Sequence, residues 1–422
     1  MSPKEIIVKT AVTGVVKVAS ALIVFFMTLI VTRNLSSEDS GFVFLSITIL
    51  TVASIIFRLG FDNFVLRKIS AEFRDSTARG VLLTGIIWIS IFSVPFSILA
   101  SYFSDSIAVV VFNKEGFSPA FKIAILGLPA ISIFMLLSKA FQGVQRVTAS
   151  VFFLNFGVSL LFSIIFILFL NVKDETANAM SSMIIYVISA YTVLFMGLIL
   201  WNRICEGDWG KVFIFNQELL KAGSNLWVAS VSTIAVQWSS VLIAGAFIDA
   251  SDFAQLSAAQ RTASLVSFIL MIVNMVVAPR FAVFWKQERL SEMKSLAKWS
   301  SRGCVLISTP LVIIIMSMSS EIMALFGDSY SNGAFYLSVL ALGQYVNVVT
   351  GSVGYLLTMS GHERDYRQVT FSVGVLTIGL SYFFIVQFGA LGAAIAAAVG
   401  LSLQNISALF LVKKRLGFFP IG

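Results

Sequence analysis

Two cations stand inside apolar stretches that are long enough to cross a membrane, and their chemistry suits the binding of an anion. Lys17 lies within the apolar run 10–31, where Thr13, Gly14 and Ser20 share its face of a helix. A cation at such a position costs about 2.5–3.5 kcal/mol on insertion scales, so it usually faces a protein interior or a wet cavity. The alternative is that the Lys17 stem snorkels and lifts its ammonium towards the headgroups.

Arg261 is the second cation of this kind, flanked on its helix face by Ser257 and Ser264 and adjoined by Gln260. An arginine can hold a phosphate through two parallel hydrogen bonds, whereas a lysine offers a point charge. The Asp and Glu residues lie in loops or at the ends of apolar runs, with Asp62 and Glu321 closest to an exception. The predicted membrane interior therefore contains cations without anions, which favours an anionic cargo.

Amide and hydroxyl side chains recur at helical spacing in two further apolar runs. Ser230, Thr233 and Gln237 share a face in one run, and Gln344 and Asn347 share a face in another. If these amides converge with Lys17 and Arg261, the combination suits a sugar attached to a phosphate. Hydrogen bonding between neighbouring helices explains each amide equally well.

The sequence lacks the patterns that catalysis or cofactor binding would require. The phosphate-binding pattern GxxxxGK[ST] is absent, and no serine triad or pair of catalytic carboxylates stands out. Cys205 and Cys304 fit no metal-binding spacing, and His362 is the only histidine. We therefore predict that the chain is not an enzyme and binds neither a metal nor another cofactor.

The composition predicts an all-α membrane protein with many spans. Hydrophobic residues make up 58% of the 422 residues and charged residues only 12%, against about 25% in soluble domains. The mean hydropathy is +0.94. Twelve spans are predicted, over residues 10–31, 41–59, 80–103, 118–138, 149–171, 178–201, 222–248, 253–279, 301–320, 334–359, 368–387 and 389–412. We expect the first span to be retained, because it is too long for a signal-peptide core and no cleavage site follows it.

The net charge of +8 is distributed as a topology signal. With an even number of spans both termini lie on one side, and that side holds most of the 29 Lys and Arg residues. The positive-inside rule then places both termini in the cytoplasm. Nucleic acid is not needed to explain the positive charge, so we predict membrane lipids and no nucleic acid as partners.

The two halves of the sequence resemble each other. Asp39 aligns with Asp252, Phe121 with Phe335, and Pro95 with Pro310, at nearly one offset. Six spans per copy is an even number, so the copies have the same orientation, as in parallel-repeat transporters. The predicted organisation is an N-terminal lobe over 1–205, a cytoplasmic linker over 206–220 and a C-terminal lobe over 221–422.

The stretches TRNLSSEDSGFVFLS, RLGFDNFVLRKIS and ALFGDSYSNGAFYLSVLALGQ, with twelve spans in two halves, carry a family resemblance. The chain resembles the Wzx-type O-antigen flippases of the multidrug/oligosaccharidyl-lipid/polysaccharide exporter superfamily. The resemblance implies two six-helix lobes forming a V-shaped central lumen, lined by the first, second, seventh and eighth spans, with Lys17 and Arg261 facing it.

The same resemblance implies a cargo and a place in the cell. The cargo would be an oligosaccharide linked to undecaprenyl diphosphate, moved from the inner to the outer leaflet of a bacterial plasma membrane. A polysaccharide polymerase and a chain-length protein would be candidate partners. Two other functions on the same fold stay open: a drug or cation antiporter, disfavoured by the missing buried acid, and a flippase for peptidoglycan precursors. A membrane polymerase or ligase is disfavoured because the short outer loops hold no histidine.

Overall fold

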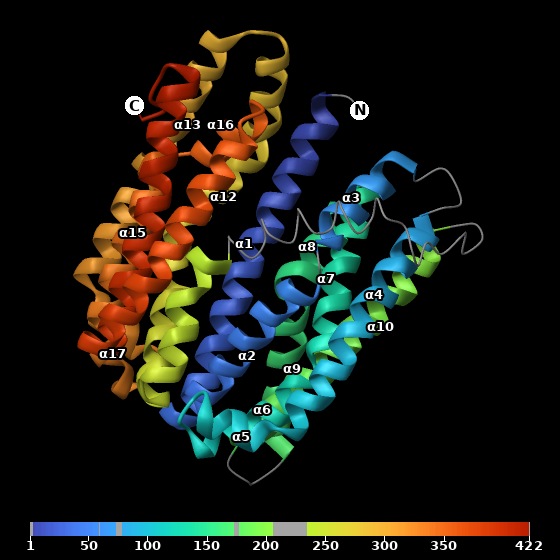
Figure 1. Ribbon diagram of the computed structural model, residues 1–422, viewed down its shortest axis with the longest axis vertical. Helices are drawn as coiled ribbons and strands as arrows, with labels where there is room; N and C mark the ends of the chain where they lie inside the picture. The colour runs from blue at the N-terminus through green and yellow to red at the C-terminus, as the bar shows by residue number, and fades with distance from the viewer. Residues whose placement is uncertain (1–2, 59, 73–77, 173–176, 206–233, 422) are drawn as a thin grey trace. The chain divides into compact units, whose positions relative to one another are not determined.

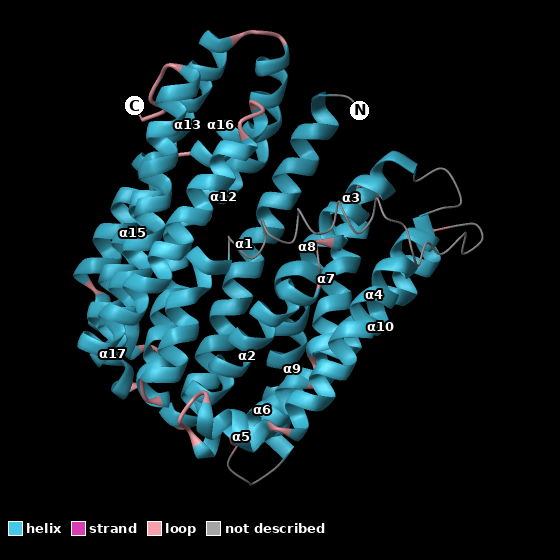
Figure 2. Ribbon diagram, viewed as in Figure 1, coloured by secondary structure: helices cyan, strands magenta, loops and turns pink. Residues whose placement is uncertain are grey.

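The computed structural model describes residues 3–58, 60–72, 78–172, 177–205 and 234–421, and the regular structure in these ranges is helical, without strands (Figure 2). This follows from the apolar composition, because the hydrocarbon core offers no water to backbone groups and a helix bonds them internally. In the same ranges eight helices are long and apolar enough to cross a membrane, and two bent helix pairs raise the number to ten.

The chain divides into two compact units. Residues 11–231 form one, called the N-terminal unit below, and residues 1–10 with 232–422 form the other, called the C-terminal unit. The predicted linker over 206–220 lies outside the described residues, as does the start of the predicted seventh span. The bounds of the two predicted lobes therefore stay a prediction.

Helices of very different length alternate along both halves of the chain (Figure 1). The first half contains α1 (Pro3–Asn34), α2 (Ser37–Phe57), α3 (Phe61–Glu72), α4 (Ala78–Tyr102), α5 (Ser104–Val110), the 3-10 helix η1 (Glu115–Phe117), α6 (Ser118–Ile125), α7 (Leu128–Gly143), α8 (Val147–Val151), the π-helix η2 (Phe152–Phe156), α9 (Gly157–Val172) and α10 (Ala179–Ile204). The second half contains an apolar helix over Ile234–Phe247, then α12 (Ala250–Lys286), α13 (Leu290–Ser317), α14 (Ser319–Ala324), the 3-10 helix η3 (Asp328–Gly333), α15 (Ala334–Thr350), α16 (Val353–Met359) and α17 (Glu363–Leu416).

The order of elements in the first half recurs in the second. A long helix containing a proline, α4 with Pro95 or α13 with Pro310, is followed by a short helix, a 3-10 turn and another apolar helix. The aligned Asp39 and Asp252 both stand in the first turn of a long helix, α2 and α12 respectively. The sequence repeat thus has a counterpart in the local structure of each half.

Polar side chains link the N-terminal end of α2 to the N-terminal end of α10. Ser36 caps α2 by accepting a hydrogen bond from the Asp39 amide at 3.0 Å, and Asn178 forms a capping box with Ser181 at the start of α10. The Asp39 carboxylate accepts a further hydrogen bond from the Ala179 amide at 2.9 Å. Asp39 therefore satisfies a free backbone donor at the beginning of α10. Its negative charge also interacts favourably with the positive N-terminal end of the α2 dipole.

Three predicted spans are interrupted in the structure, and one of them, 149–171, is bent by 59° at η2. Residues 118–138 were expected to form one kinked helix, but α6 and α7 are separate and bent by 48°, with Pro129 in the first turn of α7. Proline fits there because the amides of a first turn need no helical partner. The predicted span 334–359 breaks where α15 ends, because Gly351 adopts a φ of +72° and a Cβ there would crowd Ser301.

The element α17 is two antiparallel arms and not one straight helix. Its 54 residues would extend about 81 Å at helical rise, far beyond a hydrocarbon core of about 30 Å. Gly389, with φ +56° and ψ −132°, lies outside helical geometry and separates the arms. Asp365 and Arg415, at opposite ends of the element, form an ion pair at 2.7 Å. The chain therefore reverses at Gly389, between the predicted spans 368–387 and 389–412.

The two arms of α17 approach each other through glycines. A Cβ placed on Gly392 would overlap the backbone carbonyl of Phe384, and one placed on Gly400 would lie 2.6 Å from the Thr377 methyl. On the same interface the Gln404 amide donates to the Thr370 hydroxyl at 3.3 Å. Small residues at membrane helix contacts let backbones pack closely, which is the source of stability where lipid replaces water.

With the arms of α17 and the helix over Ile234–Phe247, every predicted span has a helical counterpart among the described residues. The count of twelve membrane crossings, and their grouping into six-helix lobes around a V-shaped lumen, stay predictions.

Candidate functional site

Lys17 lies half-buried on α1. The Ser20 hydroxyl donates its hydrogen bond to the Lys17 backbone carbonyl at 2.6 Å, within the same helix. The side chain of Thr13 is outside the described part of the chain. The described residues place no carboxylate in an ion pair with this half-buried charge.

Three other charged residues of the N-terminal unit belong to the same electrostatic neighbourhood. Lys139 on α7 acts on Lys17 and also on Asp62 at the start of α3. Arg58, which ends α2, pairs with Asp62 at 2.7 Å between Nη1 and Oδ2. We call Lys17, Arg58, Asp62 and Lys139 the N-terminal charge cluster. With three cations and one carboxylate, the cluster is net positive.

The pair in this cluster is well protected from water. Arg58 is 7% exposed, and its Nε donates to the Ser54 carbonyl at 3.1 Å. The Asp62 side chain is 21% exposed, while its Oδ1 is buried and has no hydrogen-bond partner in the described structure. Leaving one carboxylate oxygen unbonded costs free energy unless another group reaches it. Sequence reasoning did not select Arg58 or Lys139 and noted Asp62 only as an acid close to an apolar run, although the i, i+4 spacing of Arg58 and Asp62 was a visible signal.

Asp62 should leave a signature in the pH dependence of stability. It stands on α3, which is not among the helices long enough to span a membrane. Burial raises the pKa of its carboxyl from the ordinary 3.8, against the opposing pull of Arg58 and Lys139. A raised pKa means that the folded chain holds this proton more tightly, so its stabilisation is complete below the ordinary pKa. The stabilisation is lost as the pH rises through the raised pKa.

We therefore expect Asp62→Asn to become more stable relative to the unaltered chain as the pH rises. Asparagine cannot titrate, so the variant lacks this loss. Unfolding midpoints of both proteins, measured in neutral detergent across the acid to neutral range, test the expectation. If the variant instead loses ground with rising pH, the Arg58 ion pair outweighs burial and the assigned direction is wrong.

Arg261 occupies a comparable position on α12 in the C-terminal unit. It is half-buried, and the Ser264 hydroxyl donates to its backbone carbonyl at 2.6 Å. Ser257 on the same face is buried, with a hydroxyl oxygen that has no hydrogen-bond partner in the described ranges. Arg261 itself interacts with other groups of the protein.

The predicted amides also lie in the C-terminal unit. Gln237 is exposed on the helix over Ile234–Phe247, while Ser230 and Thr233 fall outside the described residues. Gln344 and Asn347 are half-buried on α15, which packs against α12. Between these two amides, Tyr345 hydrogen-bonds Thr309 of α13 at 2.8 Å, so this part of α15 is held in place. That all five predicted residues line one cavity, with Lys17 opposite the others, stays a prediction.

Comparison with known sequences shows the family to which the chain belongs. The model of the family described as "Polysaccharide biosynthesis protein" matches residues 6–285, which is more than half of the chain. The chain belongs to the polysaccharide biosynthesis protein family. The match includes α1, α2, α3, α7 and most of α12, so Lys17, the rest of the N-terminal charge cluster and Arg261 all lie within it.

A curated relative of this polysaccharide biosynthesis protein is the probable low-salt glycan biosynthesis flippase Agl15 of Haloferax volcanii. It is 25% identical over 183 residues, a region covering 42% of this chain and 38% of the relative. The match thus spans about two fifths of that relative's length.

Solved structures show the fold of this polysaccharide biosynthesis protein to be that of a transporter superfamily. The lipid II flippase MurJ in an inward closed conformation matches with a TM-score of 0.76, 14% identity, and coverage of 96% of this chain and 87% of that one. An inward-facing multidrug resistance MATE family transporter of the MOP superfamily matches with a TM-score of 0.74, 14% identity, and coverage of 96% and 98%. The chain therefore shares the fold of these two proteins, and its apolar helices indicate a multi-pass membrane protein.

Proposed function

We propose that the protein is a flippase that moves a lipid-linked oligosaccharide from the inner to the outer leaflet of a bacterial plasma membrane. The cargo is an O-antigen or related polysaccharide repeat unit on undecaprenyl diphosphate, and the transport proceeds by alternating access. Both termini lie in the cytoplasm. The observation that carries the proposal is the half-buried Lys17 within a net positive charge cluster, in a chain of the polysaccharide biosynthesis family.

The charge balance supports an anionic cargo. An unpaired cation in a dry interior would be strongly penalised, so the surroundings of Lys17 must hold either water or an anion. The cluster contains three cations, Lys17, Arg58 and Lys139, but only one carboxylate, that of Asp62. A diphosphate supplies the missing negative charge, and charge-assisted hydrogen bonds to its oxygens are stronger than neutral ones.

The roles of the other candidate residues follow from their chemistry. Arg261 would hold the diphosphate in bidentate geometry, and Gln237, Gln344 and Asn347 would exchange hydrogen bonds with sugar hydroxyls. Membrane lipids surround the helices, and a polysaccharide polymerase and a chain-length protein would receive the exported unit. No catalytic step is assigned to the chain.

A drug or cation antiporter is a second candidate, favoured by one specific observation. Asp62 carries a buried oxygen without a hydrogen-bond partner in the described residues, and a buried acid is what a cationic cargo needs. Against this, Arg58 already pairs with the carboxylate and Lys139 adds further positive charge beside it. The fold is shared with both the multidrug transporter and the lipid II flippase, so it does not separate these functions.

The deciding experiment measures where the lipid-linked oligosaccharide accumulates. Spheroplasts of a strain lacking the gene should build up the lipid-linked unit in a form that an impermeant glycan-oxidising reagent cannot reach. Expression of the unaltered chain should restore labelling and surface polysaccharide. Unchanged labelling without the gene would overturn the proposal. Loss of drug resistance would then point to the antiporter, and growth arrest with accumulated peptidoglycan precursor to the alternative flippase.

A further inference from the structure

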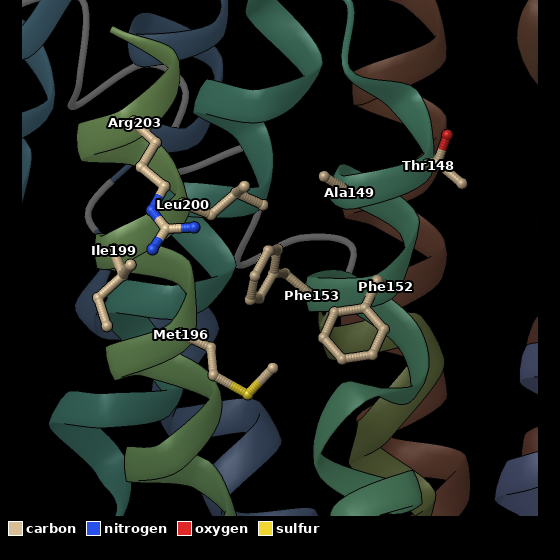
Figure 3. Close-up of a pocket in the computed structure, with 8 residues that line it drawn as sticks. All are labelled: Thr148, Ala149, Phe152, Phe153, Met196, Ile199, Leu200 and Arg203. Atoms are coloured by element: carbon tan, nitrogen blue, oxygen red, sulfur yellow. The ribbon is translucent and has the colours of Figure 1, made fainter.

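An open groove on the N-terminal unit lies apart from the charge cluster. It has a volume of about 520 Å³ and is lined by Thr148, Ala149, Phe152, Phe153, Met196, Ile199, Leu200 and Arg203 (Figure 3). One wall comes from α8 and η2 and the other from the last turns of α10. Its volume falls within the roughly 300–1,000 Å³ of small-molecule sites. None of the cluster residues lines it.

The π-helix shapes the first wall. The chain bends by 59° between residues 148–154 and 157–172, where η2 interrupts the α-helical ladder. Phe153 is buried and stacks on Phe141 with ring centroids 5.2 Å apart. The Phe152 ring lines the groove and lies at right angles to the Phe153 ring. A Cβ on Gly157 would crowd the Phe152 ring, so glycine leaves room for that ring. The wall is therefore packed from behind and preformed.

Among the described residues that line the groove, Arg203 is the only charged one. It is exposed, and it forms no ion pair or hydrogen bond among the described residues. The carbonyls at the end of its own helix are served by another arginine, since Arg79 donates to those of Cys205 and of Asn202. In Figure 3 the Arg203 guanidinium turns along the groove towards Ile199 and Leu200, with Met196 at the far end. The groove therefore has a cationic end and an apolar body.

The groove is continuous with an apolar face of α10. Ile184, Ile188 and Phe195 are 39%, 52% and 65% exposed and recur at helical spacing before Met196 and Ile199. In a multi-pass membrane protein such a face contacts acyl chains. The positive-inside pattern puts the Arg203 end of α10 at the cytoplasmic surface, where anionic headgroups attract basic residues.

We propose that this groove binds one anionic glycerophospholipid of the cytoplasmic leaflet, with its phosphate on Arg203 and an acyl chain between η2 and α10. The apolar walls suit the acyl chain. The Arg203 guanidinium, which has no partner among the described residues, suits a phosphate, which it can hold bidentately. The inference does not depend on the proposed cargo, because the two sites share no residue.

The test uses the purified full-length chain in neutral detergent, with bound lipid counted by native mass spectrometry. The probes are dioleoyl phosphatidylglycerol and dioleoyl phosphatidylcholine, which differ in net charge but not in acyl chains. We expect tighter binding of phosphatidylglycerol, and Arg203→Gln should weaken it about ten-fold, the factor that 1.4 kcal/mol represents. Arg302→Gln is the matched control, since Arg302 is also exposed and predicted to be cytoplasmic but does not line the groove.

A second variant tests the apolar body separately from the charge. Ala149→Phe should fill the groove and weaken binding of both lipids, and an unchanged gel-filtration profile would show that the protein still folds. The proposal is overturned if Arg203→Gln and Arg302→Gln have equal effects, or if the unaltered chain does not distinguish the two lipids. It is also overturned if Arg203→Gln weakens binding of undecaprenyl phosphate but not phosphatidylglycerol, because the occupant would then be the polyprenyl lipid.

Discussion

Replacing Lys17 by alanine is expected to abolish or sharply reduce surface polysaccharide while the protein stays in the membrane. The half-buried ammonium has no carboxylate partner in the described structure, so an anionic cargo can use its full charge. A charge-assisted hydrogen bond contributes about 1.5–3 kcal/mol. Its loss would lower cargo affinity by about ten-fold or more.

The conservative variants of Lys17 separate charge from shape. Lys17→Arg should retain more activity than Lys17→Gln, because the positive charge matters more here than the exact geometry. For Arg261 the order differs, and Arg261→Lys should be weaker than the unaltered chain because bidentate contact is lost. The measurement is surface-polysaccharide display in a strain lacking the native gene, with the membrane level of each variant determined in parallel.

A matched control guards this prediction against general effects of charge removal. Lys122 is exposed on α6, and Lys122→Gln should leave display unchanged. Normal display from the double variant Lys17→Ala, Arg261→Ala would contradict the binding role and show that the two cations only snorkel or pack.

Replacing Gly392 by alanine is expected to destabilise the protein by about 3 kcal/mol, the upper end of the usual range for overpacking. The added Cβ would overlap the backbone carbonyl of Phe384 in the facing arm of α17, and a backbone atom cannot move aside as a side chain can. The arms would have to separate, which also weakens the Gln404 to Thr370 hydrogen bond. The measurement is the unfolding midpoint in detergent together with the amount of protein retained in the membrane.

Gly379 provides the control for this substitution because it lies in the other arm of the same element, α17, with open space around the position of a Cβ. Gly379→Ala should be neutral or slightly stabilising, since alanine is favoured over glycine within a helix by about 0.8–1.0 kcal/mol. If the two alanine variants unfold at the same temperature, the close approach of the arms at Gly392 is not a source of stability.

Hydropathy predicted most helices of this fold because the membrane makes length and apolarity nearly sufficient signals. The break at Gly389 was placed to within a residue, because the predicted span 368–387 ends and the predicted span 389–412 begins there. A kink at Pro129 was predicted, but the separation of α6 from α7 and the end of α15 at Gly351 were not. Both depend on which neighbour occupies the adjacent space, and a periodic pattern does not contain that information.

The candidate site was predictable only in part. Lys17 was found because a lone cation within an apolar run is conspicuous, and the structure places it beside Lys139. Arg58 and Asp62 were treated as residues at a span end, but they form a protected pair. Their burial comes from the packing of α3 and α7, and α3 is too short and polar to register as a span.

The contact between Gly400 and Thr377 couples the residues that these two positions can carry. A side chain at position 400 would meet both the methyl and the hydroxyl of Thr377, the latter at 2.7 Å. An alanine at position 400 should therefore be tolerated better when residue 377 is also small. We expect related chains that lack the glycine at position 400 to carry a smaller residue at position 377.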